Sequence, residues 1–164
     1  MEHTSDQLIA LCGDEGVFLA TAESLTGGRL AAALTNTPGS SKAFLGGVVS
    51  YATAVKKEVL GVPEAVVEEH GVVSAECAAA MAEGVRRVLH ASVGISTTGV
   101  AGPDEQEGKP VGTAYVGVAT DAGTSVVSLA LTGDRASIQR QVVEAAVSAA
   151  YAIVSRRREQ QGLG

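Results

Sequence analysis

The sequence predicts an α/β protein: a three-layer α/β/α sandwich on a mixed, mostly parallel sheet that contains an antiparallel hairpin. Short apolar runs typical of buried strands alternate with longer alanine-rich runs of helical periodicity along the 164 residues. Two strand-like runs, 113–120 and 125–132, are joined by a short turn around "DAG", which indicates a hairpin. Hydrophobic residues make up 46% of the chain but aromatic residues only 3%, so small aliphatic side chains must fill closely spaced layers.

The first half of the chain contains two of the expected strands. Thr4 or Ser5 suits the cap of a first helix, and Pro63 suits the first position of a helix that ends at Gly71. The loop "NTPGSS" separates the second helix from the second strand. In order, the expected elements are a helix ending near Cys12, a strand at 17–21, a helix at 26–35, a strand at 44–51, and helices at 52–60 and 63–71.

The second half supplies the other three strands and the longest helix. Ser74 is a suitable cap for its first helix. The loop 99–112 is long and mixes glycine, proline and charge, so it is expected to be functional or mobile. Residues 159–164 are expected to fray, and the chain 1–164 is expected to form one domain. The expected elements are a helix at 75–91, strands at 93–98, 113–120 and 125–132, and a helix at 136–158.

Charge and composition argue against several classes of function. A formal net charge of -6 disfavours a grip on nucleic acid, which requires Lys and Arg to neutralise phosphates. The basic cluster 156–158 is interpreted as closing the last helix, where it meets the helix dipole favourably. No apolar run approaches the roughly 18 residues of a membrane span, and residues 1–6 are too polar for a signal peptide. A cytoplasmic protein with no nucleic-acid or membrane partner is therefore expected.

Cysteine and histidine do not indicate a metal site or a catalytic triad. Cys12 and Cys77 lie far apart, each within an apolar helical pattern, so both are expected to be reduced and buried. His3, His70 and His90 are scattered and suit surface or capping positions. The sequence therefore predicts neither a bound metal nor a cofactor.

Polar residues follow several of the expected strands, and ligands of open α/β sheets bind beyond the carboxyl ends of strands. In the first of these segments, "ESLTGG", Ser24 sits at a tight turn where a nucleophile would be exposed, beside backbone N–H groups that can stabilise an oxyanion. The alternative is that Ser24 or Thr26 only caps the next helix. The segment matches neither G-x-S-x-G nor a phosphate-loop pattern. The segments expected to converge are 23–28, 50–57, 97–102 and 133–135.

A serine nucleophile needs a neighbouring base to take its proton. Without a suitable histidine, the candidate bases are Lys56, Lys57 and Glu23. Lys56 stands out because it lies in the early turns of a helix that begins at a strand end. A partly desolvated lysine has a lowered pKa, and Ser-Lys pairs are a known variant of the catalytic triad. The alternative is a solvated surface lysine.

Further polar residues are candidates for binding. Tyr51 is either part of the site or a core-edge tyrosine whose hydroxyl has a partner. Thr98, Gly99 and Gly102 offer a hydroxyl and backbone donors, or they form only a glycine-rich turn.

For Arg135 and for the acidic residues of the long loop, a binding role and a structural role are both possible. Arg135 can clamp a phosphate or a carboxylate, or it can pair with the neighbouring Asp134. The acidic residues of the long loop suggest a magnesium site, but a solvated loop is the favoured interpretation. These residues are Asp104, Glu105 and Glu107.

Taken together, these motifs resemble the nicotinamide mononucleotide amidohydrolase family, the C-terminal domain of the competence and damage-inducible protein CinA, which also occurs as a stand-alone protein. The resemblance runs through nearly the whole chain. It rests on "TAESLTGG" at 21–28, "PGSSKAFLGGVVSYATAVKKEVLGV" at 38–62, "HGVVS" at 70–74, "TGVAGP" at 98–103, "KPVGT" at 109–113 and "GDR" at 133–135.

The resemblance implies hydrolysis of the carboxamide of nicotinamide mononucleotide, giving nicotinic acid mononucleotide and ammonia. It assigns Ser24 as the nucleophile, Lys56 as the general base and Tyr51 as an assisting residue, with N–H groups around 25–28 holding the oxyanion. It also implies a homo-oligomer and no metal. The N-terminal pyrophosphatase domain of larger CinA proteins is not expected here, nor is its metal-dependent chemistry. The implied substrate-binding residues are Glu23, Thr26, Gly27, Gly28, Thr98, Gly99, Gly102 and Arg135.

Two positions depart from the family's pattern, and two other functions stay open. Thr53 stands where relatives commonly have asparagine, and the loop "GPDEQEGKP" lacks the glycine pair that often follows Gly-Pro. Both positions adjoin the expected substrate site. The alternatives to the nucleotide amidase are a non-catalytic nucleotide-binding or regulatory module and a Ser-Lys amidase for another small amide.

Overall fold

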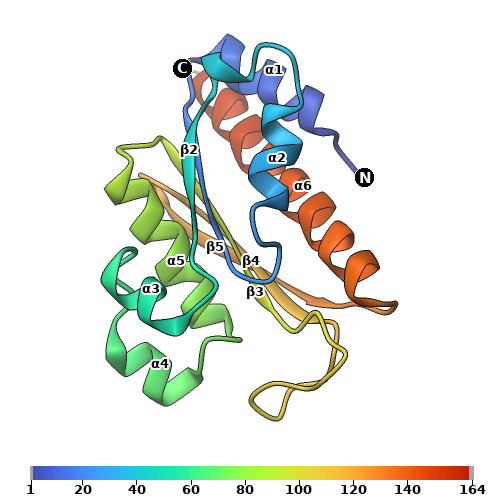
Figure 1. Ribbon diagram of the computed structural model, residues 1–164. Helices are drawn as coiled ribbons and strands as arrows, with labels where there is room; N and C mark the ends of the chain where they lie inside the picture. The colour runs from blue at the N-terminus through green and yellow to red at the C-terminus, as the bar shows by residue number, and fades with distance from the viewer. Residues whose placement is uncertain (1, 163–164) are drawn as a thin grey trace.

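The computed structural model describes residues 2–162, which fold around one five-stranded sheet (Figure 1). The strand order is β2-β1-β3-β4-β5. β1 pairs in parallel with β2 and β3, while β4 runs antiparallel to both β3 and β5. The hairpin and the mixed sheet predicted from the sequence are therefore confirmed. The strands are β1 (Leu19–Glu23), β2 (Phe44–Val49), β3 (Val93–Gly99), β4 (Thr113–Thr120) and β5 (Gly123–Ala130).

Helices cover both faces of the sheet, which confirms the three-layer architecture (Figure 1). Two apolar clusters fill the two interfaces, one under each layer of helices. On one side lie α1 (Ser5–Glu15), α2 (Arg29–Thr35) and α6 (Arg135–Gly162), and on the other α3 (Thr53–Glu58), α4 (Glu64–His70) and α5 (Ala75–Val88); the short helix η1 (Ser40–Lys42) precedes β2.

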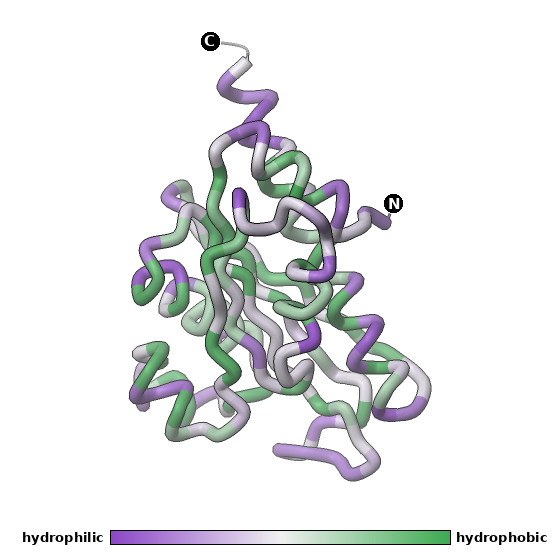
Figure 2. Tube along the Cα trace, turned by 45° about the horizontal axis from the view of Figure 1, so that its top comes forward, coloured by the Kyte–Doolittle hydropathy of each residue, from purple (hydrophilic) through white to green (hydrophobic). Residues whose placement is uncertain are grey.

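Hydropathy follows this layering along the chain (Figure 2). Hydrophobic residues concentrate in the central strands, whereas the loop after β3 and the end of α6 are hydrophilic. Within residues 2–162, none of the helices combines the length and the apolar character that a membrane span requires.

Alternation along β1 determines which layer each site residue faces. Leu19 packs in the cluster under α1, α2 and α6, whereas Ala20 and Ala22 pack in the cluster under α5. Since successive side chains of a strand point to opposite faces, Glu23 points toward the α2 layer and Ser24 toward the α3 layer. The neighbouring polar residues Glu23 and Ser24, at the end of β1, therefore lie on opposite faces of the sheet.

α5 packs very closely on the sheet, as expected for a chain with few aromatic side chains. A Cβ atom added at Gly94 or Gly117 would collide with backbone carbonyl oxygens of Ala82 and Ala78 in α5. The Ser96 hydroxyl donates to the Ala78 carbonyl at 2.5 Å. The helix therefore rests almost directly on the backbones of β3 and β4.

Several element boundaries differ from those predicted, and three of them concern the site or the end of the chain. β1 continues to Glu23 because its last residues stay in register with both neighbouring strands. The helix expected from residue 26 begins at Arg29, because Gly27 and Gly28 have φ values of +54° and +98° and cannot be helical. α6 continues to Gly162, since 159–161 are Glu, Gln and Gln, which favour helix. Residues 163 and 164 of the expected frayed tail lie outside the described residues.

Candidate active site

Ser24 lies directly after β1, in a tight turn that its own backbone helps to hold. Its N–H donates to the Thr97 carbonyl at 3.0 Å, and its carbonyl accepts from the Gly27 N–H at 3.1 Å. The residue is only 9% exposed. α2 starts after Gly28, and that cap position has no side-chain hydrogen bond, so neither Ser24 nor Thr26 caps the helix. The capping interpretation is therefore wrong, and Ser24 Oγ is free for another role.

Lys56 reaches Ser24 from α3, across the carboxyl ends of β1 and β2. Its Nζ lies 2.9 Å from Ser24 Oγ, and it donates to the carbonyl oxygens of Ser50 at 2.6 Å and Tyr51 at 3.4 Å. The lysine is 1% exposed, and this burial lowers its pKa from the ordinary value because an ammonium group loses its hydration. The sequence left open a solvated lysine, and the structure excludes it.

The other two candidate bases do not reach Ser24. Lys57 follows Lys56 but points outward, with a side chain 37% exposed that pairs with Glu64 at 3.6 Å. Glu23 points to the opposite face of the sheet, toward α2. Of the three candidates, only Lys56 touches the serine hydroxyl.

Glu23 caps α2 from a distance. One carboxylate oxygen accepts the Leu30 N–H and the Thr26 hydroxyl, both at 2.7 Å, and the other accepts the Ala31 N–H at 3.1 Å. Thr26 also bonds the Thr97 hydroxyl at 2.7 Å. Both Glu23 and Thr26 are buried and hydrogen-bonded within the turn and to the start of α2, and their contact with a substrate stays a prediction.

Glu23→Gln is expected to lower the free energy of unfolding by about 1 to 3 kcal/mol, because an amide cannot accept all three hydrogen bonds and would set an N–H against a helix N–H. Urea denaturation measures the change. Glu68→Gln, which removes an exposed carboxylate of α4, should stay within about 0.5 kcal/mol of the wild type. Equal stability of the two variants would mean that the Glu23 carboxylate does not cap α2.

Residues of the turn after Ser24 are also fixed from α6. Gln139 is buried and donates from Nε2 to the Leu25 carbonyl at 2.9 Å. Sequence analysis missed this residue; its signal is a polar side chain on the otherwise apolar face of α6. The Gly27 N–H is used inside the turn, so it is removed from the predicted oxyanion donors. The N–H groups of Leu25, Thr26 and Gly28 have no hydrogen-bond partner among the described residues.

Tyr51 and Arg135 meet at a pocket beside the turn. The Tyr51 side chain is 64% exposed and accepts from Arg135 Nη2 at 3.3 Å, so it is not buried at the core edge. Arg135 Nη1 donates to the Gly102 carbonyl at 2.7 Å. Asp134 does not pair with Arg135 but accepts the Ser137 N–H at 2.8 Å. The pocket, of about 240 Å³, is lined by Leu25, Tyr51, Arg135 and residues 100–106.

Two predicted binding residues, Thr98 and Gly99, make contacts within the fold. The Thr98 hydroxyl is buried and donates to the Val72 carbonyl at 2.7 Å. Gly99 ends β3 and pairs with Ala114 of β4, and a Cβ atom there would collide with that strand. Gly102, in contrast, lines the pocket and has a φ of +91°.

The cysteines are free and buried, as predicted. Burial raises the pKa of the Cys77 thiol to about 11 and that of Cys12 to about 12, so both stay protonated and unreactive at neutral pH. Within residues 2–162, no three His, Cys, Asp or Glu side chains gather closely enough to hold a metal ion. The acidic loop is not simply solvated, because Glu107 accepts the N–H groups of Val72 and Val73.

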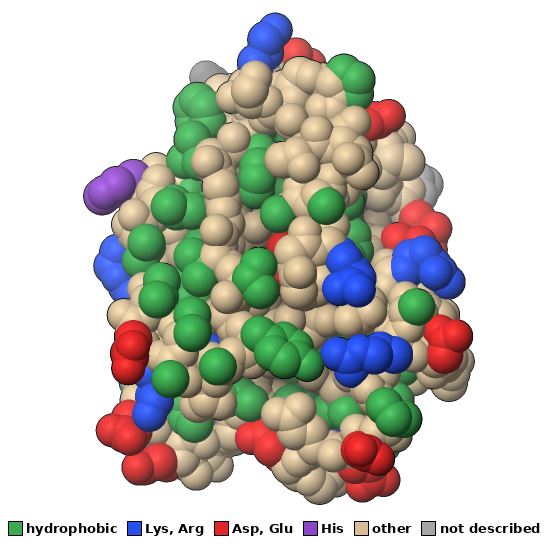
Figure 3. All heavy atoms as spheres, viewed as in Figure 1, with side chains coloured by type: hydrophobic (Ala, Val, Ile, Leu, Met, Phe, Trp, Pro, Cys, Tyr) green, Lys and Arg blue, Asp and Glu red, His purple; other side chains and the backbone are tan. Residues whose placement is uncertain are grey.

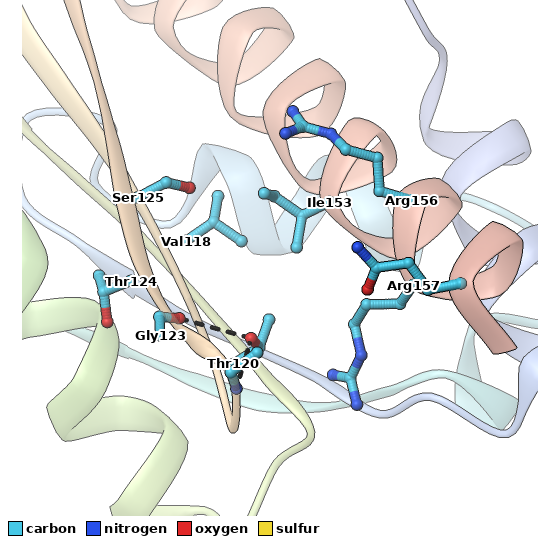
Figure 4. Close-up of a pocket in the computed structure, with 10 residues that line it drawn as sticks. Val118, Thr120, Gly123, Thr124, Ser125, Ile153, Arg156 and Arg157 are labelled. Atoms are coloured by element: carbon cyan, nitrogen blue, oxygen red, sulfur yellow. Dashed lines mark hydrogen bonds between the residues drawn. The ribbon is translucent and has the colours of Figure 1, made fainter.

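Another pocket, of about 290 Å³, lies away from Ser24, between the β4–β5 turn and α6 (Figure 4). Arg157 pairs there with Asp121 at 3.1 Å, while Arg158 pairs with Glu15 at 3.2 Å. α6 continues past these arginines to Gly162 and has no basic residue in its last turn. The prediction that the cluster 156–158 closes the helix and meets its dipole is therefore wrong. None of the predicted site residues lines this pocket.

Comparison with known proteins shows the family of this chain. The family model described as the CinA C-terminal domain matches residues 1–154. The chain belongs to the CinA C-terminal domain family. It is 51% identical over 140 residues to a CinA-like protein of Frankia casuarinae, covering 85% of this chain and 32% of that protein. It is 53% identical over 122 residues to a putative competence-damage inducible protein of a Geobacillus species, covering 74% and 29%.

Solved structures of CinA superfamily proteins have the same fold. A CinA superfamily protein of Klebsiella pneumoniae superimposes with a TM-score of 0.90 at 29% identity, covering 93% of this chain and 96% of that one. The competence/damage inducible protein CihA of Agrobacterium tumefaciens gives a TM-score of 0.84 at 29% identity, covering 93% and 98%. The chain spans about a third of the length of the curated relatives that it matches.

Proposed function

We propose that this CinA domain hydrolyses the carboxamide of nicotinamide mononucleotide to nicotinic acid mononucleotide and ammonia through an ester on Ser24. The observation that carries the proposal is the buried contact of 2.9 Å between Lys56 Nζ and Ser24 Oγ. A lysine buried without a carboxylate partner is costly to keep as an ammonium, and its neutral amine suits proton abstraction near neutral pH. A binding module has no need of such a pair.

The reaction divides into acylation and deacylation. Lys56 takes the Ser24 proton as Oγ attacks the amide carbon, and free N–H groups of the turn stabilise the oxyanion. Lys56 then gives its proton to the departing nitrogen, the C–N bond breaks and ammonia leaves. In the second half, Lys56 takes a proton from water, hydroxide attacks the ester, and the proton returns to Ser24 Oγ. The carbonyl oxygens of Ser50 and Tyr51 hold the amine in place throughout.

The pocket beside the turn is suited to the nucleotide part of the substrate. The Arg135 guanidinium is exposed at its rim and offers a planar fork of donors to a phosphate. Tyr51 shares this rim and provides an aromatic face next to the nucleophile turn. Arg135 and Tyr51 are thus proposed as substrate-binding residues, with Tyr51 also close to the leaving nitrogen.

The test is product analysis with the purified protein, nicotinamide mononucleotide and a chelator. Equal amounts of ammonia and nicotinic acid mononucleotide support the amidase. Binding without ammonia favours a nucleotide-binding or regulatory module, and ammonia from other amides alone favours an amidase of different substrate range. Either of these last two results would overturn the proposed substrate.

Self-association is also proposed, on the apolar surface along the outer strand β2. Hydrophobic side chains gather over β2 and α3 (Figure 3). Leu45, Val49 and Val59 are exposed there, and β2 carries neither a charge nor a proline to discourage pairing.

A double substitution, Leu45→Lys with Val49→Lys, is expected to reduce the mass in light scattering to that of a 16.5 kDa monomer. Val127→Lys, at an exposed apolar position of the other edge strand, should leave the wild-type mass unchanged. A wild-type protein that is monomeric at all concentrations would refute self-association.

A further inference from the structure

A carboxylate attaches the tip of the long loop between β3 and β4 to a neighbouring part of the fold. Gln106 and Lys109 pair as a small antiparallel bridge, so 106–109 form a tight turn. Glu107 in this turn has a φ of +54°, a conformation that a glutamate rarely adopts. Its two carboxylate oxygens accept the N–H groups of Val72 at 2.9 Å and Val73 at 2.7 Å, in the connection between α4 and α5.

Neighbouring residues complete the attachment. Lys109 Nζ donates to the Val73 carbonyl and lies 3.5 Å from the His70 carbonyl. Gly71 has a φ of +78°, and a Cβ atom there would collide with the Glu107 carboxylate. The α4–α5 connection is therefore shaped to receive this side chain.

The anchored loop is also a wall of the pocket. Residues 100–106 line the pocket beside Ser24, and Arg135 holds the loop on its other side through the Gly102 carbonyl. The loop thus has two attachments, one to α6 and one to the α4–α5 connection (Figure 1). Without the Glu107 carboxylate, Lys109 is left as the side-chain attachment of the loop tip to the α4–α5 connection.

We infer that Glu107 is a positioning residue of the site, which anchors the pocket wall to the α4–α5 connection. Its catalytic consequence rests on the proposed amidase function, but the anchoring does not. Burial lowers the Lys56 pKa, and the negative charge of Glu107 opposes this effect. Glu107 is thus the carboxylate that moderates the effect of burial on the base.

Two measurements on Glu107→Gln test this without substrate, with Glu68→Gln as the control that removes an exposed carboxylate of α4. Amide hydrogen exchange at Val72 and Val73 should accelerate at least about tenfold in Glu107→Gln alone, since one acceptor is lost. The Lys56 pKa, followed by NMR of its side chain, should fall, because a nearby negative charge stabilises the ammonium. Unchanged exchange or an unchanged or raised Lys56 pKa overturns the inference.

Kinetics with nicotinamide mononucleotide then show the effect on the site. KM should rise about tenfold in Glu107→Gln because the pocket wall loses an anchor. The acid limb of the pH profile of kcat/KM should move to lower pH, because the Lys56 pKa falls when the Glu107 charge is removed. Greater mobility of the loop alone would not lower this pKa. An unaltered KM together with an unmoved acid limb would overturn the role in the site. An inactive wild type refutes the amidase and leaves the exchange and pKa results as they stand.

Discussion

Lys56→Ala is expected to reduce kcat/KM for nicotinamide mononucleotide by at least about 10³-fold while the fold is retained, because it removes the base that contacts Ser24 Oγ. The circular dichroism spectrum should be unchanged, since α3 keeps its helix-forming residues. Lys57→Ala is the matched control: it removes the next lysine, which faces solvent and pairs with Glu64, and should retain near-normal activity. Near-normal turnover by Lys56→Ala would eliminate Lys56 as the base.

The pH dependence of the wild type tests the same role. Only the neutral amine can accept the serine proton, so kcat/KM should rise with pH as Lys56 loses its proton. Burial lowers the Lys56 pKa, which places this rise below the ordinary range of lysine. Below the pKa, activity should fall about tenfold per pH unit. A profile that is flat across the acid range would contradict a lysine base.

Ser24→Ala is expected to have the largest effect, a loss of at least about 10³-fold in kcat, because no ester can form. Binding of nicotinamide mononucleotide, followed by calorimetry, should persist, since Arg135 and Tyr51 are untouched. Ser41→Ala, at an exposed serine of η1, provides the control and should behave as the wild type. Residual turnover within tenfold of the wild type would show that another group attacks the amide.

Much of the fold was accessible from sequence because its signals are local. The hairpin follows from two strand-like runs joined by a short turn. The start of α2 was predicted too early, because the positive φ values of Gly27 and Gly28 exclude them from the helix. The convergence of the polar segments was also predictable, because parallel strands end at one edge of a sheet. Lys56 and Ser24 lie 32 positions apart, yet each follows a strand of that edge.

The supporting residues could not be predicted in this way. Glu23 precedes Ser24 in sequence, but its role depends on which face of β1 meets α2. Gln139 and Glu107 act through hydrogen bonds to backbone groups more than 30 positions away, and a backbone donor or acceptor carries no sequence signal. For the same reason Thr98 resembled a binding residue, although its hydroxyl serves the Val72 carbonyl.

The most direct test of the account is to detect the ester on Ser24. Protein in excess over nicotinamide mononucleotide is quenched in acid within a single turnover, and its intact mass and peptides are measured. The account predicts a species heavier by the nucleotide less ammonia, with the addition mapped to Ser24 and absent from Ser24→Ala. An addition mapped to another residue, or ammonia release at the wild-type rate by Ser24→Ala, would contradict it.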